Sequence, residues 1–292
     1  MAEIFEHAGE MEHIVREGGS DMLAHKVMAT LFYEPSTRTR LSFESAMKRL
    51  GGDVIATENA REFSSAAKGE TLEDTIRIVE GYADVVVLRH YESGAAERAA
   101  SVTDVPIINA GDGPGQHPTQ ALLDMYTIQK EIGHLDGISI AMVGDLANGR
   151  TVRSLSYLLA KYEDVHIYFV APEVVQMKDD IKEYLTRHHV SFSEETDLKA
   201  VASKVDVIYQ TRIQRERFGD RIEDYEKASG VYIVDRHILS AMKPDAIVMH
   251  PLPRIGEIKP EVDSDHRAAY FRQAQNGLYI RMALLKMLLC PE

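Results

Sequence analysis

The sequence predicts an α/β protein of two three-layer α/β/α domains with mostly parallel sheets, in which a C-terminal helix closes back on the first domain. Two observations predict this class. Short apolar runs of strand length alternate with amphipathic helical stretches, which is the βαβ rhythm of a sheet covered by helices on both sides. Several runs are almost wholly apolar, as strands buried on both faces are. The 292 residues, 45% of them hydrophobic, suffice for about two such domains.

The elements follow one another in a regular order. A helical pattern opens the chain, with Ile4, Ala8 and Met11 at spacings of four and three residues. The clearest amphipathic helices between strands span 119–132 and 151–162. Apolar and β-branched runs predict strands at 27–33, 84–90, 106–109, 138–144, 165–170, 205–211, 231–235 and 246–250.

The glycine-flanked segment 133–137 predicts the break between the domains. We expect the first domain to span 1–133 and the second to span 134–266. A long helix at about 267–292 is expected to complete the first domain, with an interruption at Asn276-Gly277.

Composition excludes several classes of protein. The net charge of −13 argues against broad binding to nucleic acids or anionic membranes. The single cysteine, Cys290, excludes a disulfide framework and fits a reducing compartment. No run approaches the ~18 apolar residues of a membrane span. The acidic N-terminus is unlike a targeting peptide. Because the chain begins inside a helical pattern, the sequence is also compatible with a longer precursor whose transit peptide has been removed.

The segment after the first predicted strand has the character of an anion site. Ser36 is expected to cap a helix whose first N–H groups point outward, and such groups bind phosphate together with the helix dipole. Arg38 and Arg40 add fork-shaped cationic donors. The alternative is a well-capped helix with two solvated arginines.

Similar side chains follow the other predicted strands, at the sheet edge where ligands bind in parallel α/β folds. Arginine and histidine recur in the segments that follow the strands, whereas a chance distribution would place arginine mostly on helix surfaces. The residues concerned are Arg89-His90, Gly111-Asp112-Gly113, His117-Pro118-Thr119-Gln120, Gly144 to Thr151, Thr211-Arg212-Ile213-Gln214 and His250-Pro251-Leu252-Pro253-Arg254.

The inventory lacks paired carboxylates, Cys/His metal spacing and a G-x-S-x-G nucleophile elbow. The loop 144–151 has a G-x-x-x-x-G frame without the lysine of a P-loop, so nucleotide binding there is not expected. Arginines, hydroxyls, amides and a histidine remain. This set suits two anionic substrates held together while negative charge develops on a carbonyl oxygen, without a covalent intermediate, metal or cofactor.

Two histidines and one carbonyl have alternative roles. His117 begins a helix, where the dipole disfavours its protonated form, so it either donates to a carbonyl or simply caps the helix. His250 is expected to satisfy loop backbone with its side chain. The prolines around Leu252 are expected to force an extended backbone that fixes the Leu252 carbonyl as an acceptor for an amine, although a plain turn is equally compatible.

Taken together, these segments resemble those of the transcarbamoylase family, and their sequences are most similar to plant-type aspartate carbamoyltransferases. The segments occur in family order and span nearly the whole chain. They are Ser36-Thr37-Arg38-Thr39-Arg40, Lys68-Gly69-Glu70-Thr71, Val87-Leu88-Arg89-His90, Asn109 to Gly113, His117-Pro118-Thr119-Gln120, Val143-Gly144-Asp145, Gly149-Arg150-Thr151, Thr211-Arg212-Ile213-Gln214 and His250 to Arg254.

The resemblance implies carbamoyl transfer from carbamoyl phosphate to L-aspartate, which gives N-carbamoyl-L-aspartate and phosphate in pyrimidine biosynthesis. The implied catalytic residues are Arg38, Thr39, Lys68, Arg89, His117 and Gln120. The implied carbamoyl phosphate ligands are Ser36, Thr37, Arg38, Thr39, Ser64, Lys68, Arg89, His117, Gln120, Leu252 and Pro253. The implied aspartate ligands are Lys68, Arg150, Arg212, Gln214 and Leu252.

The resemblance also implies partners and a location. Ser64 and Lys68 match positions that a neighbouring subunit donates in the family, so a homotrimer with shared active sites is expected. Without the resemblance, Lys68 would be read as an ordinary surface lysine. The expected location is intracellular: the cytoplasm, or the chloroplast stroma for a plant-type chain freed of its transit peptide.

One departure and two rivals accompany this interpretation. Ala147-Asn148 replaces a pair that is often basic or aromatic in the family. An ornithine carbamoyltransferase would share the carbamoyl phosphate half, but it typically has His-Cys-Leu-Pro where this chain has His250-Pro251-Leu252-Pro253. A non-catalytic paralogue would have lost a phosphate or carbonyl contact, and each matched position here carries the functional residue type.

Overall fold

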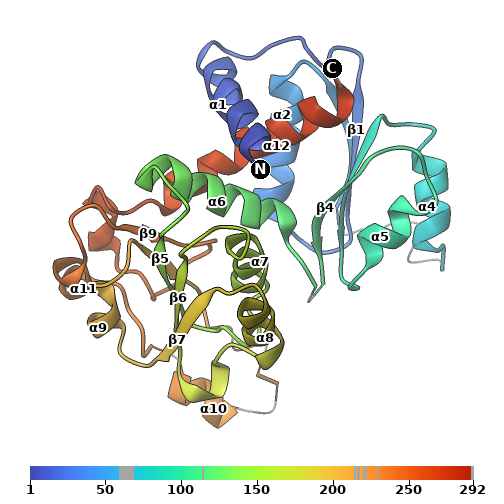
Figure 1. The fold of residues 1–292 in the computed structure, drawn as a ribbon. Helices are drawn as coiled ribbons and strands as arrows, with labels where there is room; N and C mark the ends of the chain where they lie inside the picture. The colour runs from blue at the N-terminus through green and yellow to red at the C-terminus, as the bar shows by residue number, and fades with distance from the viewer. Residues whose placement is uncertain are drawn as a thin grey trace. The chain divides into compact units, whose positions relative to one another are not determined.

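The computed structural model describes residues 1–58, 69–113, 115–213, 215, 218–219, 222–228 and 230–290. The chain forms two compact units (Figure 1). Unit 1 comprises residues 1–119 and 275–292, and unit 2 comprises residues 120–274. Within the described residues, we find no helix with the length and apolar character needed to span a bilayer.

Unit 1 is built on a four-stranded parallel sheet with the order β2-β1-β3-β4. Its strands are β1 (Val27–Phe32), β2 (Asp53–Glu58), β3 (Val85–His90) and β4 (Ile107–Asp112). Figure 1 shows α4 (Leu72–Val79) and α5 (Ala95–Ala100) on one face of this sheet. The other face carries α1 (Ala2–Arg16), α2 (Thr37–Arg49) and the C-terminal part of α12 (Tyr270–Leu289). Unit 1 therefore has three layers.

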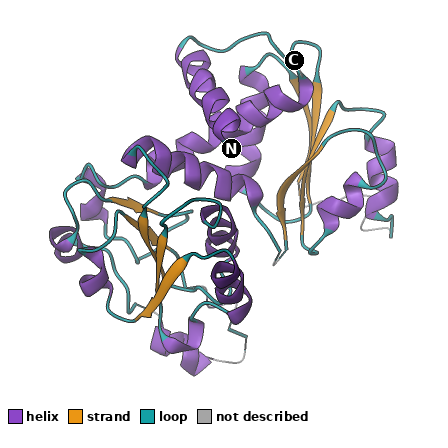
Figure 2. Cartoon of the chain, in the orientation of Figure 1, coloured by secondary structure: helices purple, strands orange, loops and turns teal. Residues whose placement is uncertain are grey.

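Unit 2 is built on a five-stranded parallel sheet with the order β7-β6-β5-β8-β9. The strands are β5 (Ser139–Val143), β6 (His166–Val170), β7 (Ser191–Glu195), β8 (Val207–Gln210) and β9 (Ile247–Met249). The helices are α6 (Pro118–Ile132), α7 (Arg150–Leu159), α8 (Asp179–Arg187), α9 (Leu198–Ala202), α10 (Ile222–Ala228) and α11 (Arg236–Ala241), with short 3-10 turns at Glu173–Val175 and Pro260–Ser264. In Figure 2 the strands of each unit lie between helices, which confirms the α/β class.

The strands whose side chains are buried on both faces formed where the sequence predicted them. All side chains of β8 and β9 are buried, and so are nearly all of those of β1, β3 and β5. A parallel strand in such a position must be apolar throughout, and this produces the recognisable run in the sequence.

Two strands were missed, and both are edge strands. β2 begins with Asp53 and exposes most of its side chains up to Thr57. β7 has the sequence Ser-Phe-Ser-Glu-Glu and contains no fully buried side chain. An edge strand that faces water needs no apolar run, so its pattern resembles that of a loop.

Two expectations about elements were wrong. Residues 231–235 form no regular strand: Val234 makes an isolated bridge to Ile258, and Asp235 caps α11 through bonds from His237 N and Ile238 N. α12 runs through Asn276-Gly277 without a break. Asn276 is 2% exposed, so burial of this turn outweighs the weak helix propensity of the pair.

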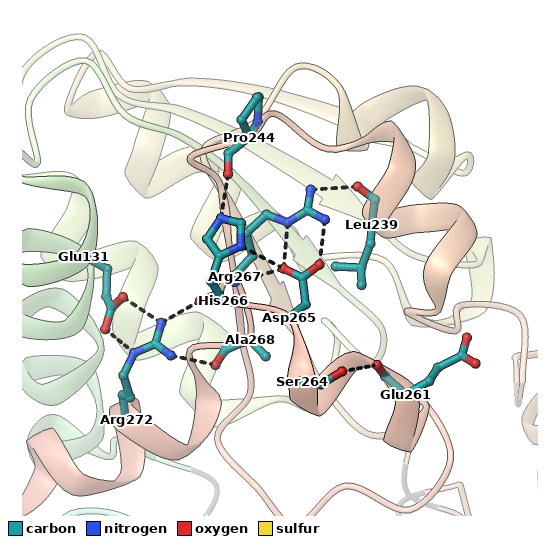
Figure 3. A network of polar contacts seen from close by, with 10 residues as sticks. All are labelled: Glu131, Leu239, Pro244, Glu261, Ser264, Asp265, His266, Arg267, Ala268 and Arg272. Carbon is teal, nitrogen blue, oxygen red and sulfur yellow. Dashed lines mark hydrogen bonds and ion pairs between the residues drawn. The ribbon is translucent and has the colours of Figure 1, made fainter.

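Polar contacts fix the N-terminal end of α12 within unit 2 (Figure 3). Arg272 donates from Nε and Nη2 to the two oxygens of Glu131 on α6, at 2.7 Å each, and also to the carbonyls of His266 and Ala268. Arg267 binds Asp265 through Nε and Nη2 and donates to Leu239 O at 2.8 Å. The hydrogen bonds from Arg267 lower the pKa of Asp265 to about 2.

Candidate active site

The first predicted anion loop lies between β1 and α2. Ser36 occupies the N-cap position of α2 with an extended backbone at φ −158°, although its side chain makes no capping hydrogen bond among the described residues. Thr37 and Arg38 are exposed in the first helical turn, whereas Thr39 is buried. The first N–H groups of a helix have no intrahelical acceptor, and here they lie beside hydroxyl and guanidinium donors, which makes this turn a suitable site for a phosphate group.

Arg89 lies next to this loop on the neighbouring strand. It pairs in register with Phe32, the last residue of β1. Its carbonyl accepts from Tyr33 N at 2.9 Å, and its Nε lies 3.6 Å from Glu34 Oε2. These contacts place a partly buried guanidinium beside the segment that leads into Ser36.

The loop before His117 is held by Asp112 at the end of β4. Oδ1 of Asp112 accepts from Gln116 N at 2.8 Å, and Oδ2 accepts from Gly94 N at 2.9 Å. Gly113 has φ +54° and donates to His90 O at 2.7 Å. His117 is the last residue of this loop and directly precedes α6, and it is 5% exposed. Because β1, β3 and β4 are parallel, their carboxyl ends present this histidine, Arg89 and the anion loop at one edge of the sheet.

The corresponding edge of unit 2 begins with the loop after β5. Oδ1 of Asp145 accepts from Asn148 N at 3.1 Å and from Asn148 Nδ2 at 3.0 Å. Gly149 is the N-cap of α7, so Arg150 is the first residue of that helix. Asn148, which belongs to the pair that differs from the family pattern, is therefore a structural turn residue that sets the start of α7.

Arg212 follows β8, the strand next to β5. Thr211 donates from both N and Oγ1 to Val143 O, at 2.8 Å each, which fixes the exit from the strand. Gly144 lies so close that a Cβ atom there would be 2.6 Å from Thr211 O. Arg150 and Arg212 therefore follow adjacent strands at the same sheet edge. The predicted partner Gln214 lies outside the described residues, as do Ser64 and Lys68.

The loop after β9 is organised by His250, whose side chain is 1% exposed. Nδ1 of the imidazole accepts from Leu252 N at 2.7 Å, so its proton is on Nε2, which donates to Glu257 Oε1 at 2.8 Å. This confirms that the side chain of His250 satisfies loop backbone. Burial opposes ionisation of Glu257, but the bonds from His250 and from backbone N–H groups prevail and lower its pKa to about 2.

The extended backbone expected at Leu252 was wrong. Leu252 has φ +54°, in the left-handed region, and precedes a cis peptide bond to Pro253. Its N–H turns back to Nδ1 of His250, and this hydrogen bond holds the tight turn. Arg254, at the end of the loop, has a structural role. It pairs with both oxygens of Asp263 and donates to Tyr270 Oη at 3.1 Å.

Gln120 lies in the first turn of α6 and is held by a residue that the sequence analysis missed. Its Nε2 donates to Asp124 Oδ1 at 2.9 Å. Asp124 is fully buried and also accepts from Tyr209 Oη and from Gln273 Nε2, at 2.7 Å each. Burial, followed by the proximity of Asp124, raises the pKa of Tyr209 well above its usual value. The available signal was an aspartate four residues after Gln120 in an otherwise apolar helical stretch.

The edge of unit 1 thus offers donors for a phosphate and a carbonyl, and the edge of unit 2 offers two arginines for carboxylates. Among the described residues, no group of three or more His, Cys, Asp or Glu side chains is arranged to hold a metal ion. The chemistry available is binding, orientation and hydrogen bonding to a developing oxyanion.

Comparison with protein families agrees with this division of donors. Residues 1–130 match the model described as "Aspartate/ornithine carbamoyltransferase, carbamoyl-P binding domain". Residues 136–288 match the model described as "Aspartate/ornithine carbamoyltransferase, Asp/Orn binding domain".

Comparison with individual proteins gives long, close matches. The chain is 70% identical over 290 residues to a protein of Arabidopsis thaliana named "Aspartate carbamoyltransferase, chloroplastic", covering 99% of this chain and 74% of the relative. It is similar to the catalytic subunit of M. jannaschii aspartate transcarbamoylase, with a TM-score of 0.92, 50% identity and coverage of 99% and 93%. It also matches aspartate transcarbamoylase of Trypanosoma cruzi in complex with carbamoyl phosphate and aspartate, with a TM-score of 0.90, 43% identity and coverage of 97% and 90%.

Proposed function

The chain belongs to the aspartate/ornithine carbamoyltransferase family, and from this premise we propose that it transfers the carbamoyl group of carbamoyl phosphate to L-aspartate, in pyrimidine biosynthesis. The observation that carries the proposal is the presence of two separate arginine sets at strand ends. Arg38 and Arg89 belong to unit 1, and Arg150 and Arg212 belong to unit 2. One set suits a phosphate, and the other suits a dicarboxylate.

In unit 1, the first turn of α2 holds the phosphate of carbamoyl phosphate. Ser36, Thr37 and Thr39 contribute hydroxyl groups and Arg38 contributes its guanidinium, in line with the amide donors and helix dipole at this position. Arg89 bridges the phosphate and the carbamoyl oxygen. Its position beside the loop, next to the end of β1, supports this role.

Three donors stabilise the negative charge that develops on the carbamoyl oxygen when the carbamoyl carbon is attacked. They are the hydroxyl of Thr39, the guanidinium of Arg89 and the imidazole of His117. Fixed donors of this kind act on charge that develops only in the transition state, so they raise kcat and not merely affinity. Gln120 and the Leu252 carbonyl hold the carbamoyl nitrogen beside Pro253, which leaves the carbonyl carbon open to attack.

In unit 2, Arg150 and Arg212, with Gln214, bind the two carboxylates of aspartate. Forked guanidinium groups suit carboxylates because they donate two parallel hydrogen bonds. The amine of aspartate attacks the carbamoyl carbon directly. The C–N bond forms, the C–O bond to phosphate breaks, and the departing phosphate accepts the amine proton.

The decisive experiment measures product formation from carbamoyl phosphate with aspartate and with ornithine, side by side. We expect carbamoyl aspartate and no citrulline, because the cationic side chain of ornithine would meet Arg150 and Arg212. Turnover only with ornithine would show that unit 2 was misinterpreted. Binding of carbamoyl phosphate without turnover of either amine would identify a non-catalytic paralogue.

We further propose that the active form is a homotrimer in which Ser64 and Lys68 act in a neighbouring subunit's site. Family membership supports this arrangement. Inactive Lys68→Ala and Arg38→Ala proteins, once mixed and exchanged, should regain part of the activity, because some sites then receive both intact residues. An exchanged mixture that stays inactive would exclude a shared site.

The functional halves and the location complete the proposal. We assign 1–133 with the closing helix 267–292 to the carbamoyl phosphate half and 134–266 to the aspartate half, which the family matches ending at 130 and starting at 136 support. The Arabidopsis relative is named as chloroplastic, which supports the chloroplast stroma over the cytoplasm. Fractionation of the source cells with a specific antibody tests this location.

A further inference from the structure

Asp124 is a fully buried carboxyl group to which the proposed mechanism gives no part. It lies on α6, and two of its partners come from elements far away in the sequence. Tyr209 is on β8, 85 residues away, and Gln273 is on α12, 149 residues away. All of these residues belong to unit 2. A buried polar group with several specific partners fixes the orientation of each partner.

One oxygen of Asp124 accepts from two glutamine side chains. Oδ1 lies 2.9 Å from Gln120 Nε2 and 2.7 Å from Gln273 Nε2. The carboxyl oxygen that faces Gln120 acts as the acceptor, so Gln120 must turn its NH₂ toward Asp124. The carbonyl end of the Gln120 amide then faces away from Asp124, and this end accepts hydrogen bonds.

The second glutamine carries the constraint to the loop after β9. Oε1 of Gln273 accepts from His250 N at 2.8 Å, which fixes its amide orientation independently, because a backbone N–H can only donate. His250 in turn accepts from Leu252 N at 2.7 Å. A continuous chain of hydrogen bonds therefore joins Asp124 to the backbone of Leu252.

We propose that Asp124 is a positioning residue for the carbamoyl nitrogen of the substrate. Through Oδ1 it sets the two acceptors that face this nitrogen, namely the amide oxygen of Gln120 and the carbonyl of Leu252. Two acceptors suit the two hydrogens of a carbamoyl NH₂ group, and inorganic phosphate has no NH₂ group to place there. This inference rests on the proposed function, and it predicts that Asp124 distinguishes carbamoyl phosphate from inorganic phosphate.

Three variants separate positioning from general stability. Asp124→Leu removes the shared acceptor. Asp124→Asn keeps an oxygen at the Oδ1 position and can donate from Nδ2 to Tyr209 Oη, so it should preserve the arrangement of both glutamines. Gln273→Met cuts only the branch to His250 and leaves the bond from Gln120 to Asp124. Glu131→Gln is the matched control, because it weakens another contact between α6 and α12, the pair with Arg272 (Figure 3).

The first measurement compares the KM for carbamoyl phosphate with the Kd for inorganic phosphate. We expect Asp124→Leu and Gln273→Met to raise the KM at least tenfold while the phosphate Kd stays within twofold. Asp124→Asn should stay closer to the wild type than Asp124→Leu, and Glu131→Gln should change neither constant. Equal weakening of both ligands, or an Asp124→Asn variant as impaired as Asp124→Leu, would overturn the proposal.

The second measurement needs no activity, so it separates a failure of this inference from a failure of the proposed function. Hydrogen exchange of the His250 and Leu252 amides is followed in the ligand-free protein. Gln273→Met should accelerate exchange at least tenfold, and it serves in place of Asp124→Leu if that variant does not fold. Unchanged exchange in a folded Gln273→Met protein would refute the link to the loop. A wild-type protein that forms no carbamoyl aspartate would instead refute the proposed function.

Discussion

Glu257 accepts a hydrogen bond from the Nε2–H of His250 over 2.8 Å, and this pair holds the loop that carries Leu252. The other oxygen of Glu257 accepts from Ile255 N at 3.1 Å and from Gly256 N at 3.0 Å. One carboxylate thus satisfies three donors on both sides of the loop. The His250 imidazole is consequently a neutral scaffold group, fixed in one tautomer, and not an acid or base of the reaction.

Replacing this carboxylate should destabilise the protein in a pH-dependent way. Glu257→Gln presents an NH₂ group to at least one of the three donors, so we expect a loss of about 1–3 kcal/mol at pH 7. The pKa of Glu257 is lowered to about 2 from 4.5, so its stabilisation is complete above 4.5 and disappears as the pH falls toward 2. Urea unfolding should show a constant gap between wild type and variant from pH 7 to about 5, and a closing gap below. A gap that widens in acid would contradict the assignment.

Arg212 is predicted to act on aspartate and not on carbamoyl phosphate. Arg212→Ala removes charge-assisted hydrogen bonds, each with a net contribution of about 1.5–3 kcal/mol, so the KM for aspartate should rise about 10- to 150-fold. The KM for carbamoyl phosphate should stay unchanged. Arg236→Ala is the matched control, because the side chain of Arg236 is 77% exposed on the same unit. A selective loss of carbamoyl phosphate binding in Arg212→Ala would reverse the assignment.

Gly113 is predicted to be intolerant of any side chain. A Cβ atom at Gly113 would lie 2.1 Å from Tyr91 O, and the residue has φ +54°. Gly94 has φ +78° but no atom within 4 Å of such a Cβ position, so Gly94→Ala measures the cost of the backbone conformation alone. Thermal unfolding should show Gly113→Ala as the less stable by more than about 2 kcal/mol. Equal stabilities would mean that the loop accommodates the methyl group without strain.

Asp235 should contribute to stability without affecting catalysis. Its Oδ1 accepts from His237 N at 2.9 Å and from Ile238 N at 3.1 Å, which caps α11. Asp235→Ala should cost about 1 kcal/mol, and Asp235→Asn should retain most of the cap. Carbamoyl aspartate formation at 25 °C should match the wild type in both variants. A large loss of activity in a folded Asp235→Asn protein would imply a role beyond capping.

The elements that could be predicted from sequence are those whose environment constrains every side chain. The strands β1, β3, β5, β8 and β9 have side chains that are buried on both faces, and they therefore formed recognisable apolar runs. The edge strands β2 and β7 carry no such constraint. The segment around Val234 had a strand-like composition, but its local hydrogen bonds and the cap at Asp235 took precedence over propensity.

The features of the candidate site also fall into those that could be predicted from the sequence and those that could not. Arg89, His117 and Arg212 could be found because parallel strands bring their carboxyl ends to one edge of a sheet. Asp124 stood out only as a carboxylate in an apolar helical stretch; its network could not be recognised, because two of its three partners lie 85 and 149 residues away along the chain. The left-handed turn at Leu252 was also hidden, since it depends on the bond to the His250 ring.

The chain passes between its two compact units inside helices, at 119/120 in α6 and at 274/275 in α12. Unit 2 is therefore an insertion within unit 1. During synthesis, all of unit 2 leaves the ribosome before residues 275–292, which complete unit 1, so unit 2 can fold while its host still lacks the end of α12. Arg281, whose guanidinium lies 5.1 Å from the centre of the Phe43 ring, belongs to that late segment. The order of translation thus makes the carbamoyl phosphate half, although encoded first, the last to be completed.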